Sequence, residues 1–227
     1  MVESLYIPEQ LISSLGKDEQ FNSRSVSVYD SKTMKADAKK KLVKKATKLI
    51  NTENAIDGTT RFENIASEKV HFTFSWGTHL SDEQFEWVFQ LFVTNMRVMY
   101  QISQWGYDEV SKKQEFRATT SRYIIAKNQN DKPIAYLHYR FDIDFDSAVL
   151  YCYEIQVESA YQVKGVGSAL LSIAECLAKK MSMDKLMATV FAFNGNSLAF
   201  FHKNGFSVDP SCPDDGDYVI LSKPLSN

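Results

Sequence analysis

Apolar residues recur at spacings of three and four in two parts of the chain, which predicts two amphipathic helices. The first follows Ser81-Asp82-Glu83-Gln84, whose serine and glutamine stand at the positions of a capping box. Its apolar face comprises Phe85, Val88, Phe89, Phe92, Met96 and Met99. The second helix carries Leu170, Ile173, Ala174, Leu177, Ala178 and Met181. We expect each helix to bury this face against the rest of the domain.

Strands are predicted between and after these helices. Runs rich in β-branched and aromatic residues indicate strands over 70–76, 123–127, 134–142, 149–157 and 186–191. A polar turn, Asn128-Gln129-Asn130-Asp131, joins two of them, and a short helix is expected over 197–203. This alternation of strands and helices predicts an α/β fold.

The N-terminal part shows one further helical stripe, formed by Ala38, Leu42, Ala46, Leu49 and Ile50. Its flanks carry Lys35, Lys39, Lys40, Lys41, Lys44, Lys45 and Lys48. The simpler interpretation is a helix packed on the domain with solvated lysines. The alternative is nuclear import or a contact with nucleic acid, on the ribosome or in chromatin. We therefore expect an N-terminal helical segment, residues 1–60, packed on a domain of residues 61–227.

Composition is that of an ordinary soluble globular protein. The chain has 227 residues, of which 44% are hydrophobic and 24% charged, with a formal net charge of −2. Its cysteines, Cys152, Cys176 and Cys212, lack the spacing of metal ligands, so we expect a reducing compartment and no disulfide. No apolar run is long enough to span a membrane. We expect a monomer found in the cytoplasm and nucleus.

The loop Gln162-Val163-Lys164-Gly165-Val166-Gly167 stands between a predicted strand and a predicted helix. Glycines let the backbone approach a ligand closely, and a helix start offers unpaired N–H groups to an anion. The loop lacks the Gly-Lys-Ser/Thr of a Walker A motif and the third glycine of a dinucleotide-binding fingerprint, since Leu170 stands there. We interpret it as a cradle for the pyrophosphate of a different nucleotide, although an ordinary turn before a helix is the simpler interpretation of the loop alone.

The loop resembles Gln/Arg-x-x-Gly-x-Gly/Ala, the acyl-CoA loop of the GNAT N-acetyltransferases. The downstream order of that superfamily is also present, with a strand, Asn194, a short helix and Gly205-Phe206. The resemblance implies a GNAT fold, in which helices flank a mixed, mostly antiparallel central sheet. It also implies acetyl-CoA as co-substrate and no metal.

Two further segments resemble the NatD-type histone N-terminal acetyltransferases. They are Asn95-Met96-x-x-Met99-Tyr100-x-x-Ser103-x-Trp105-Gly106 and Leu150-Tyr151-Cys152-Tyr153-Glu154-x-Gln156. The likeness runs from about residue 81 to 223. It implies acetylation of the α-amine of histone H4 and the A-type histone H2, whose tails begin Ser-Gly-Arg-Gly-Lys.

Glu154 is the residue that the resemblance implies as general base, because it ends an apolar and aromatic strand just before the loop. Its alternative is a glutamate paired with a lysine at a sheet edge. Alternation along the strand puts Tyr151 and Tyr153 on one face and Glu154 on the other. A β-bulge near residues 153–155 would let all three reach one site, so we predict a bulge there.

The same likeness assigns the remaining site residues. It implies a peptide pocket of Tyr100, Trp105, Asp142, Asp144, Tyr151, Tyr153, Thr189 and Tyr218. It implies cofactor contacts from Ile155, Gln156, Val157, Gln162, Val163, Lys164, Gly165, Val166, Gly167, Ser168 and Asn194. Asp142 and Asp144 point to one side of an extended segment and are suited to an Arg or an α-amine, although a polar strand end is the simpler interpretation of both.

Two positions depart from the family pattern. Phe201 stands where many members carry a tyrosine that protonates the leaving thiolate. The acid is then absent, supplied by water, or replaced by a tyrosine such as Tyr153. Asp144 stands where animal members carry the longer Glu. Two other functions stay open: a GNAT enzyme acting on lysine side chains or small amines, and an acyl-CoA-binding module without catalysis.

Overall fold

A computed structural model describes residues 36–49, 64–65 and 68–225. A seven-stranded sheet has the order β3-β4-β5-β6-β7-β9-β8. The strands are β3 His71–Trp76, β4 Arg122–Lys127, β5 Pro133–Asp144, β6 Ser147–Val157, β7 Lys185–Phe191, β8 Ser207–Val208 and β9 Tyr218–Pro224. A separate two-stranded ladder joins β1 Asn64–Ile65 to β2 Glu68–Lys69. In the large sheet only β6 and β7 run parallel, so the predicted mixed and mostly antiparallel sheet is confirmed.

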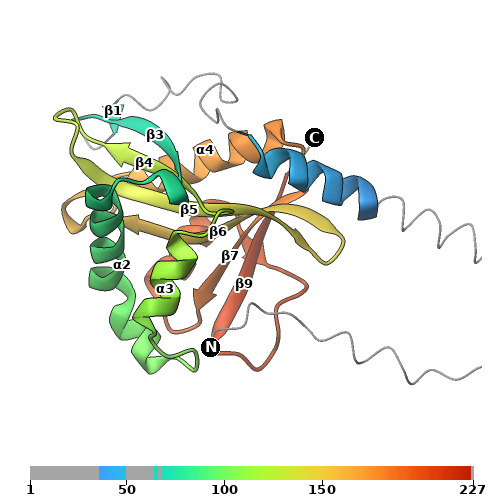
Figure 1. Ribbon diagram of the computed structural model, residues 1–227. Coiled ribbons are helices and arrows are strands. Elements are labelled where there is room, and N and C mark those ends of the chain that lie inside the picture. The colour runs from blue at the N-terminus through green and yellow to red at the C-terminus, as the bar shows by residue number, and fades with distance from the viewer. Residues whose placement is uncertain (1–35, 50–63, 66–67, 226–227) are drawn as a thin grey trace, which may run out of the picture.

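Helices cover both faces of this sheet (Figure 1). They are α2 Asp82–Ile102, α3 Glu109–Phe116, α4 Val166–Lys180, α5 Gly195–Lys203 and a helix over 36–47, with 3-10 turns η4 Gly77–His79 and η5 Ser159–Tyr161. Strand alternation decides which face each side chain joins: Tyr123 packs with α2, whereas Ile124 packs with α4. Both are fully buried, because neither face of the sheet is left open.

Local signals explain where α2 and α4 begin. The Ser81 hydroxyl accepts a hydrogen bond from the Gln84 amide, and the Gln84 side chain accepts one from the Ser81 amide, so the predicted capping box is present. Helix α4 starts after Gly165, whose φ of 93° is in the left-handed region. The apolar faces predicted for both helices pack into the core, except for Met99, which is half-buried and lies outside both core clusters.

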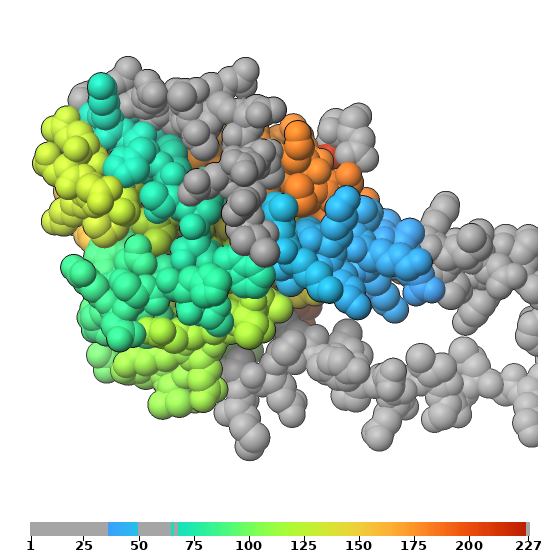
Figure 2. Space-filling view, turned by 45° about the horizontal axis from the view of Figure 1, so that its top comes forward, coloured from blue at the N-terminus to red at the C-terminus, as the bar shows by residue number. Residues whose placement is uncertain are grey.

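The helix over 36–47 lies beside α4 at one end of the sheet (Figures 1 and 2). It packs through Ala46 and its apolar neighbours, while Lys39 forms a 2.9 Å ion pair with Asp184. The predicted stripe is wrong at Ala38, which is exposed, and Val43 packs on the core instead. Ile50 and Lys35 lie outside the described residues, as does most of the predicted segment 1–60.

The remaining lysines of this helix are exposed: Lys40, Lys41, Lys44, Lys45 and Lys48. This arrangement fits a solvated face, and contact with the ribosome or chromatin stays a prediction. Within the described ranges, no helix is long and apolar enough to cross a membrane.

Candidate active site

The site opens where two neighbouring strands separate. The parallel ladder between β6 and β7 runs from Val149 opposite Lys185 to Cys152 opposite Ala188 and ends there. Beyond it lies a cavity of about 1680 Å³, lined by the continuations of both strands, by α2 and α3, and by the start of α4. A cavity of this size has room for an extended cofactor arm and a peptide together.

A β-bulge shapes the floor of this cavity. On β5, His138 pairs with Glu154 but the next residue, Tyr139, pairs with Cys152, so Tyr153 is an extra residue on β6. The predicted bulge is therefore present. It lets consecutive side chains reach one space, because Tyr151, Tyr153 and Glu154 all line the cavity and the two tyrosine rings are 5.3 Å apart.

Glu154 is 5% exposed and holds hydrogen bonds on both carboxylate oxygens. Oε1 lies 2.8 Å from the Lys112 ammonium and 3.2 Å from the Tyr100 hydroxyl, which donates to it. Oε2 accepts from the Gln156 amide at 2.9 Å, and Asn95 donates in turn to the Gln156 oxygen at 3.0 Å. Glu154 does pair with a lysine, as the alternative interpretation of this residue predicted. It does not lie at a sheet edge, because β6 is the fourth of the seven strands.

Lys112 lines the cavity beside Glu154, and sequence reasoning missed it. It lies on α3, a helix for which no prediction was made, and its side chain is 9% exposed. Burial alone would lower the pKa of Lys112, but the charges of Glu154 and Glu115 raise it well above its usual value. The only local signal for α3 is Asp108, whose carboxylate caps it by accepting from two backbone amides.

The tyrosines around Glu154 are neutral phenols at physiological pH. Burial raises the pKa of Tyr151 to about 12, and its hydroxyl shares a 2.5 Å hydrogen bond with Thr189. Burial and then the charge of Glu154 raise the pKa of Tyr100, and burial raises that of Tyr153. The O–H of Tyr100 is already donated to Glu154, whereas Tyr153 can donate a hydrogen bond to a substrate oxygen or to a leaving group.

An aromatic wall encloses the outer part of the cavity. The Trp105 ring lies 5.2 Å from Tyr218 and 5.1 Å from Phe191, which is also 5.1 Å from Tyr100. Phe191 was not predicted as a site residue, although it ends the strand that was expected to precede Asn194. Such a wall suits the uncharged backbone and small side chains of an extended peptide.

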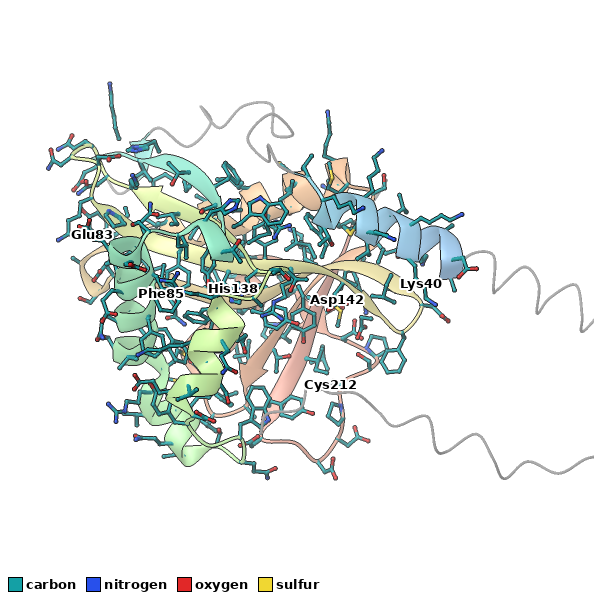
Figure 3. All side chains as sticks on the ribbon, in the orientation of Figure 1. Lys40, Glu83, Phe85, His138, Asp142 and Cys212 are labelled. Atoms are coloured by element: carbon teal, nitrogen blue, oxygen red, sulfur yellow. The ribbon has the colours of Figure 1, made fainter. Side chains whose placement is uncertain are left out.

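Two carboxylates lie at the far end of the cavity, on β5. Asp142 is exposed, and its only hydrogen bond in the described chain is accepted from the neighbouring Ile143 amide. It lies four residues beyond His138 on the same strand (Figure 3). Asp144 forms a 3.1 Å ion pair with Lys185, which also pairs with Asp209 at 2.7 Å. Of the two predicted acids, Asp142 is thus the one with a free carboxylate.

The glycine loop presents a helix start to the cavity. The first α4 amide with a partner within the helix is that of Ala169, which donates to the Gly165 carbonyl. The amides before it have no partner within the helix, and Gly167 and Ser168 line the cavity. A Cβ on Gly167 would meet the Phe200 ring at 3.1 Å, so a side chain here would require that ring to move by a few tenths of an ångström. These amides and the positive end of α4 form a site that fits an anionic phosphate.

The side chains of this loop divide into two groups. Gln162 donates to the Val157 carbonyl at 3.1 Å and so ties the loop to the end of β6. The Val166 side chain is buried in the core and Lys164 is exposed, and neither lines the cavity. The Asn194 side chain accepts from the Ser197 amide and caps α5.

Most predicted residues therefore line one cavity. They are Tyr100, Trp105, Asp142, Asp144, Tyr151, Tyr153, Glu154, Ile155, Gln156, Val157, Gln162, Val163, Gly165, Gly167, Ser168, Thr189, Asn194 and Tyr218. Phe201 is 3% exposed in the core. Across the described residues no group of three or more His, Cys, Asp or Glu side chains is placed to hold a metal ion.

The sequence and the fold were compared with known protein families and solved structures. The sequence model of the Acetyltransferase (GNAT) family matches residues 67–206. The fold is similar to the PaiA N-acetyltransferase from Thermoplasma acidophilum in complex with coenzyme A, with a TM-score of 0.51 and 19% identity over 67% of this chain and 98% of that one. It is similar to a GNAT-family acetyltransferase from Listeria monocytogenes (TM-score 0.52, 14% identity, 71% and 98%).

A third similar structure is the NatC complex bound to Gag peptide and CoA, with a TM-score of 0.50 and 18% identity over 68% of this chain and 99% of that one. At these identities the likeness shows the fold. The family match is longer than half of the chain and contains the bulged strand, the glycine loop and the helix that follows it. The protein therefore belongs to the acetyltransferase (GNAT) family, whose acetyl donor is acetyl-CoA.

Proposed function

We propose that this acetyltransferase is a NatD-type enzyme that acetylates protein N-termini, with Glu154 as general base. Its proposed acceptors are the tails of histone H4 and the A-type histone H2, which begin Ser-Gly-Arg-Gly-Lys. One observation carries the proposal: a buried carboxylate lies on the floor of a cavity with an aromatic wall and a free carboxylate at its far end. The α-amine of a bound peptide would meet Glu154, its backbone would lie along the aromatic wall, and its arginine would meet Asp142.

The reaction is direct transfer of the acetyl group. The amine nitrogen attacks the thioester carbonyl, a C–N bond forms, the C–S bond breaks, and the sulfur leaves as the thiolate. Glu154 accepts the proton that the amine loses. An α-amine with a pKa near 7.7–8.0 costs only about 1 kcal/mol to deprotonate at pH 7, whereas a lysine costs about 4 to 5 kcal/mol. A single carboxylate is therefore better matched to an α-amine.

Mass spectrometry of a short peptide tests this proposal. The purified protein is mixed with acetyl-CoA and Ser-Gly-Arg-Gly-Lys, and separately with the same peptide whose α-amine is blocked. We expect one acetyl group on the free N-terminus and none on the blocked peptide. Acetyl on the blocked peptide would establish lysine chemistry instead, and no product on either would refute the proposed acceptor.

Tyr153 is assigned to the departing thiolate, because Phe201 has no proton to donate. Replacing Tyr153 by phenylalanine (Y153F) should lower kcat about fivefold, since one neutral hydrogen bond is worth about 1 kcal/mol. The matched control is Y136F, which removes a buried phenol that does not line the cavity and should keep the wild-type kcat. The measurement is the kcat of both variants. Equal kcat values in Y153F and wild type would remove Tyr153 from this role.

Gly165 should be required for acetyl-CoA binding. An alanine at its φ of 93° is strained by about 1 to 2 kcal/mol, so G165A should be less stable and should bind acetyl-CoA more weakly as the loop shifts. The control is G195A, where an added Cβ meets nothing within 4 Å. Urea unfolding and calorimetric titration with acetyl-CoA measure the two effects. Wild-type affinity in G165A would show that the loop does not hold the cofactor.

A further inference from the structure

Lys112 is surrounded by partners on every N–H of its ammonium group. It lies 2.8 Å from Glu154 Oε1 and donates to Glu115 Oε1 at 2.9 Å and to the Tyr100 hydroxyl at 2.9 Å. An ammonium has three donors, so these contacts use all of them. Lys112 is therefore held in one orientation and is not free to reach a substrate.

Aromatic rings complete the enclosure of this lysine. Its nitrogen lies 5.0 Å from the ring centres of Phe92 and Tyr100 and 5.4 Å from that of Phe116. Rings at this distance stabilise a cation, and they exclude water that would otherwise screen its charge. The charge of Lys112 therefore acts on Glu154 with little screening.

Tyr100 is held between the two charged groups. Its hydroxyl accepts from Lys112 and donates to Glu154 Oε1. Oε1 thus contacts both Lys112 and Tyr100, while Oε2 accepts one hydrogen bond, from the Gln156 amide. A carboxylate oxygen has two lone pairs, so Oε2 keeps one that can accept from an incoming amine.

We propose that Lys112 is a positioning residue that pairs with Glu154 Oε1 and leaves Oε2 as the oxygen that receives the proton of the amine. This inference rests on the proposed function, because it assigns a role relative to Glu154 as base. A single carboxylate can serve an amine that is already partly neutral at pH 7, as an α-amine is, and it serves a lysine poorly.

The prediction concerns pH, so the neighbours of the carboxylate matter. The titratable groups packed around Glu154 are Tyr100 on α2, Lys112 and Glu115 on α3, Tyr123 on β4, Tyr136 and His138 on β5, and Cys152 on its own strand. Burial raises the pKa of the Cys152 thiol and lowers that of His138, so both are neutral. Arg140 on β5 is a second cation of the cavity, but it lies over the Tyr153 ring and donates to the Glu115 carbonyl at 2.9 Å. Among the described residues, Lys112 is thus the cation in ion-pair contact with Glu154.

The test is the pH profile of kcat/KM for K112M, K112R and K113M with the same peptide. Without a neighbouring cation the buried carboxylate holds its proton to higher pH. The acid limb of the kcat/KM profile of K112M should therefore move to higher pH by about one unit or more, and the loss of kcat/KM should be largest below pH 7. K112R keeps the charge and should restore most of the profile. K113M is the matched control, because Lys113 pairs with Glu109 on the exposed side of the same helix.

A double variant separates positioning from folding. Lys112 acts only through Glu154, so adding K112M to E154Q should cause no further loss of rate and no shift. An equal loss at every pH in K112M, or the same loss in the E154Q background, would overturn the proposal. If K112M does not fold, K112R still decides, because a K112R profile that loses rate equally at every pH would overturn the proposal. A fully active E154Q would instead refute Glu154 as the base, so the two failures are distinguishable.

Discussion

Replacing Glu154 by glutamine (E154Q) should lower kcat by about 100-fold or more and leave the Kd for acetyl-CoA near its wild-type value. The loss of a positioned general base has this usual magnitude. Affinity should survive because the phosphate site at the start of α4 and the carboxylate on β6 use different residues. Steady-state kinetics with the short histone-like peptide and calorimetry with acetyl-CoA measure the two quantities.

The matched control is E158Q, at the residue that directly follows the end of β6. Glu158 accepts from the Trp87 indole at 3.0 Å and does not line the cavity, so E158Q should keep wild-type kcat. A wild-type kcat in E154Q would exclude Glu154 as base and would favour an acceptor amine that loses its proton to water before it binds.

Replacing Asp142 by asparagine (D142N) should raise the KM for Ser-Gly-Arg-Gly-Lys about 10- to 150-fold with little change in kcat. A charge-assisted hydrogen bond to arginine is worth about 1.5 to 3 kcal/mol, and it lies away from the reacting atoms. D144N should have a smaller effect on KM, because Lys185 already pairs with Asp144.

A second peptide makes this prediction specific. With alanine in place of the arginine, D142N and the wild-type enzyme should show the same KM, because the contact is already lost. A loss of kcat with an unchanged KM for the arginine peptide would contradict the assignment of Asp142 to arginine binding.

Short-range patterns predicted much of the fold because their physics is local. The capping box at Ser81 involves residues three apart, and the apolar stripe of α4 follows from helix periodicity alone. The glycine loop was recognisable because a helix start after a left-handed glycine needs only neighbouring residues. By contrast, α3 was not predicted, since its sequence is mostly polar and its burial depends on α2 and the sheet.

The sequence by itself determined the strands β3 to β7, the starts of α2 and α4, the glycine loop and which residue types stand near it, because each depends on neighbours within a few positions. It did not predict α3, β8 or β9. Only the tertiary structure decided that Lys112 lies 2.8 Å from Glu154, that Asp144 is paired with Lys185 while Asp142 is not, and that the ladder to β7 ends at Cys152. These contacts join residues about 40 positions apart. They follow from how α3 and β7 pack against β6, and no local pattern encodes that packing.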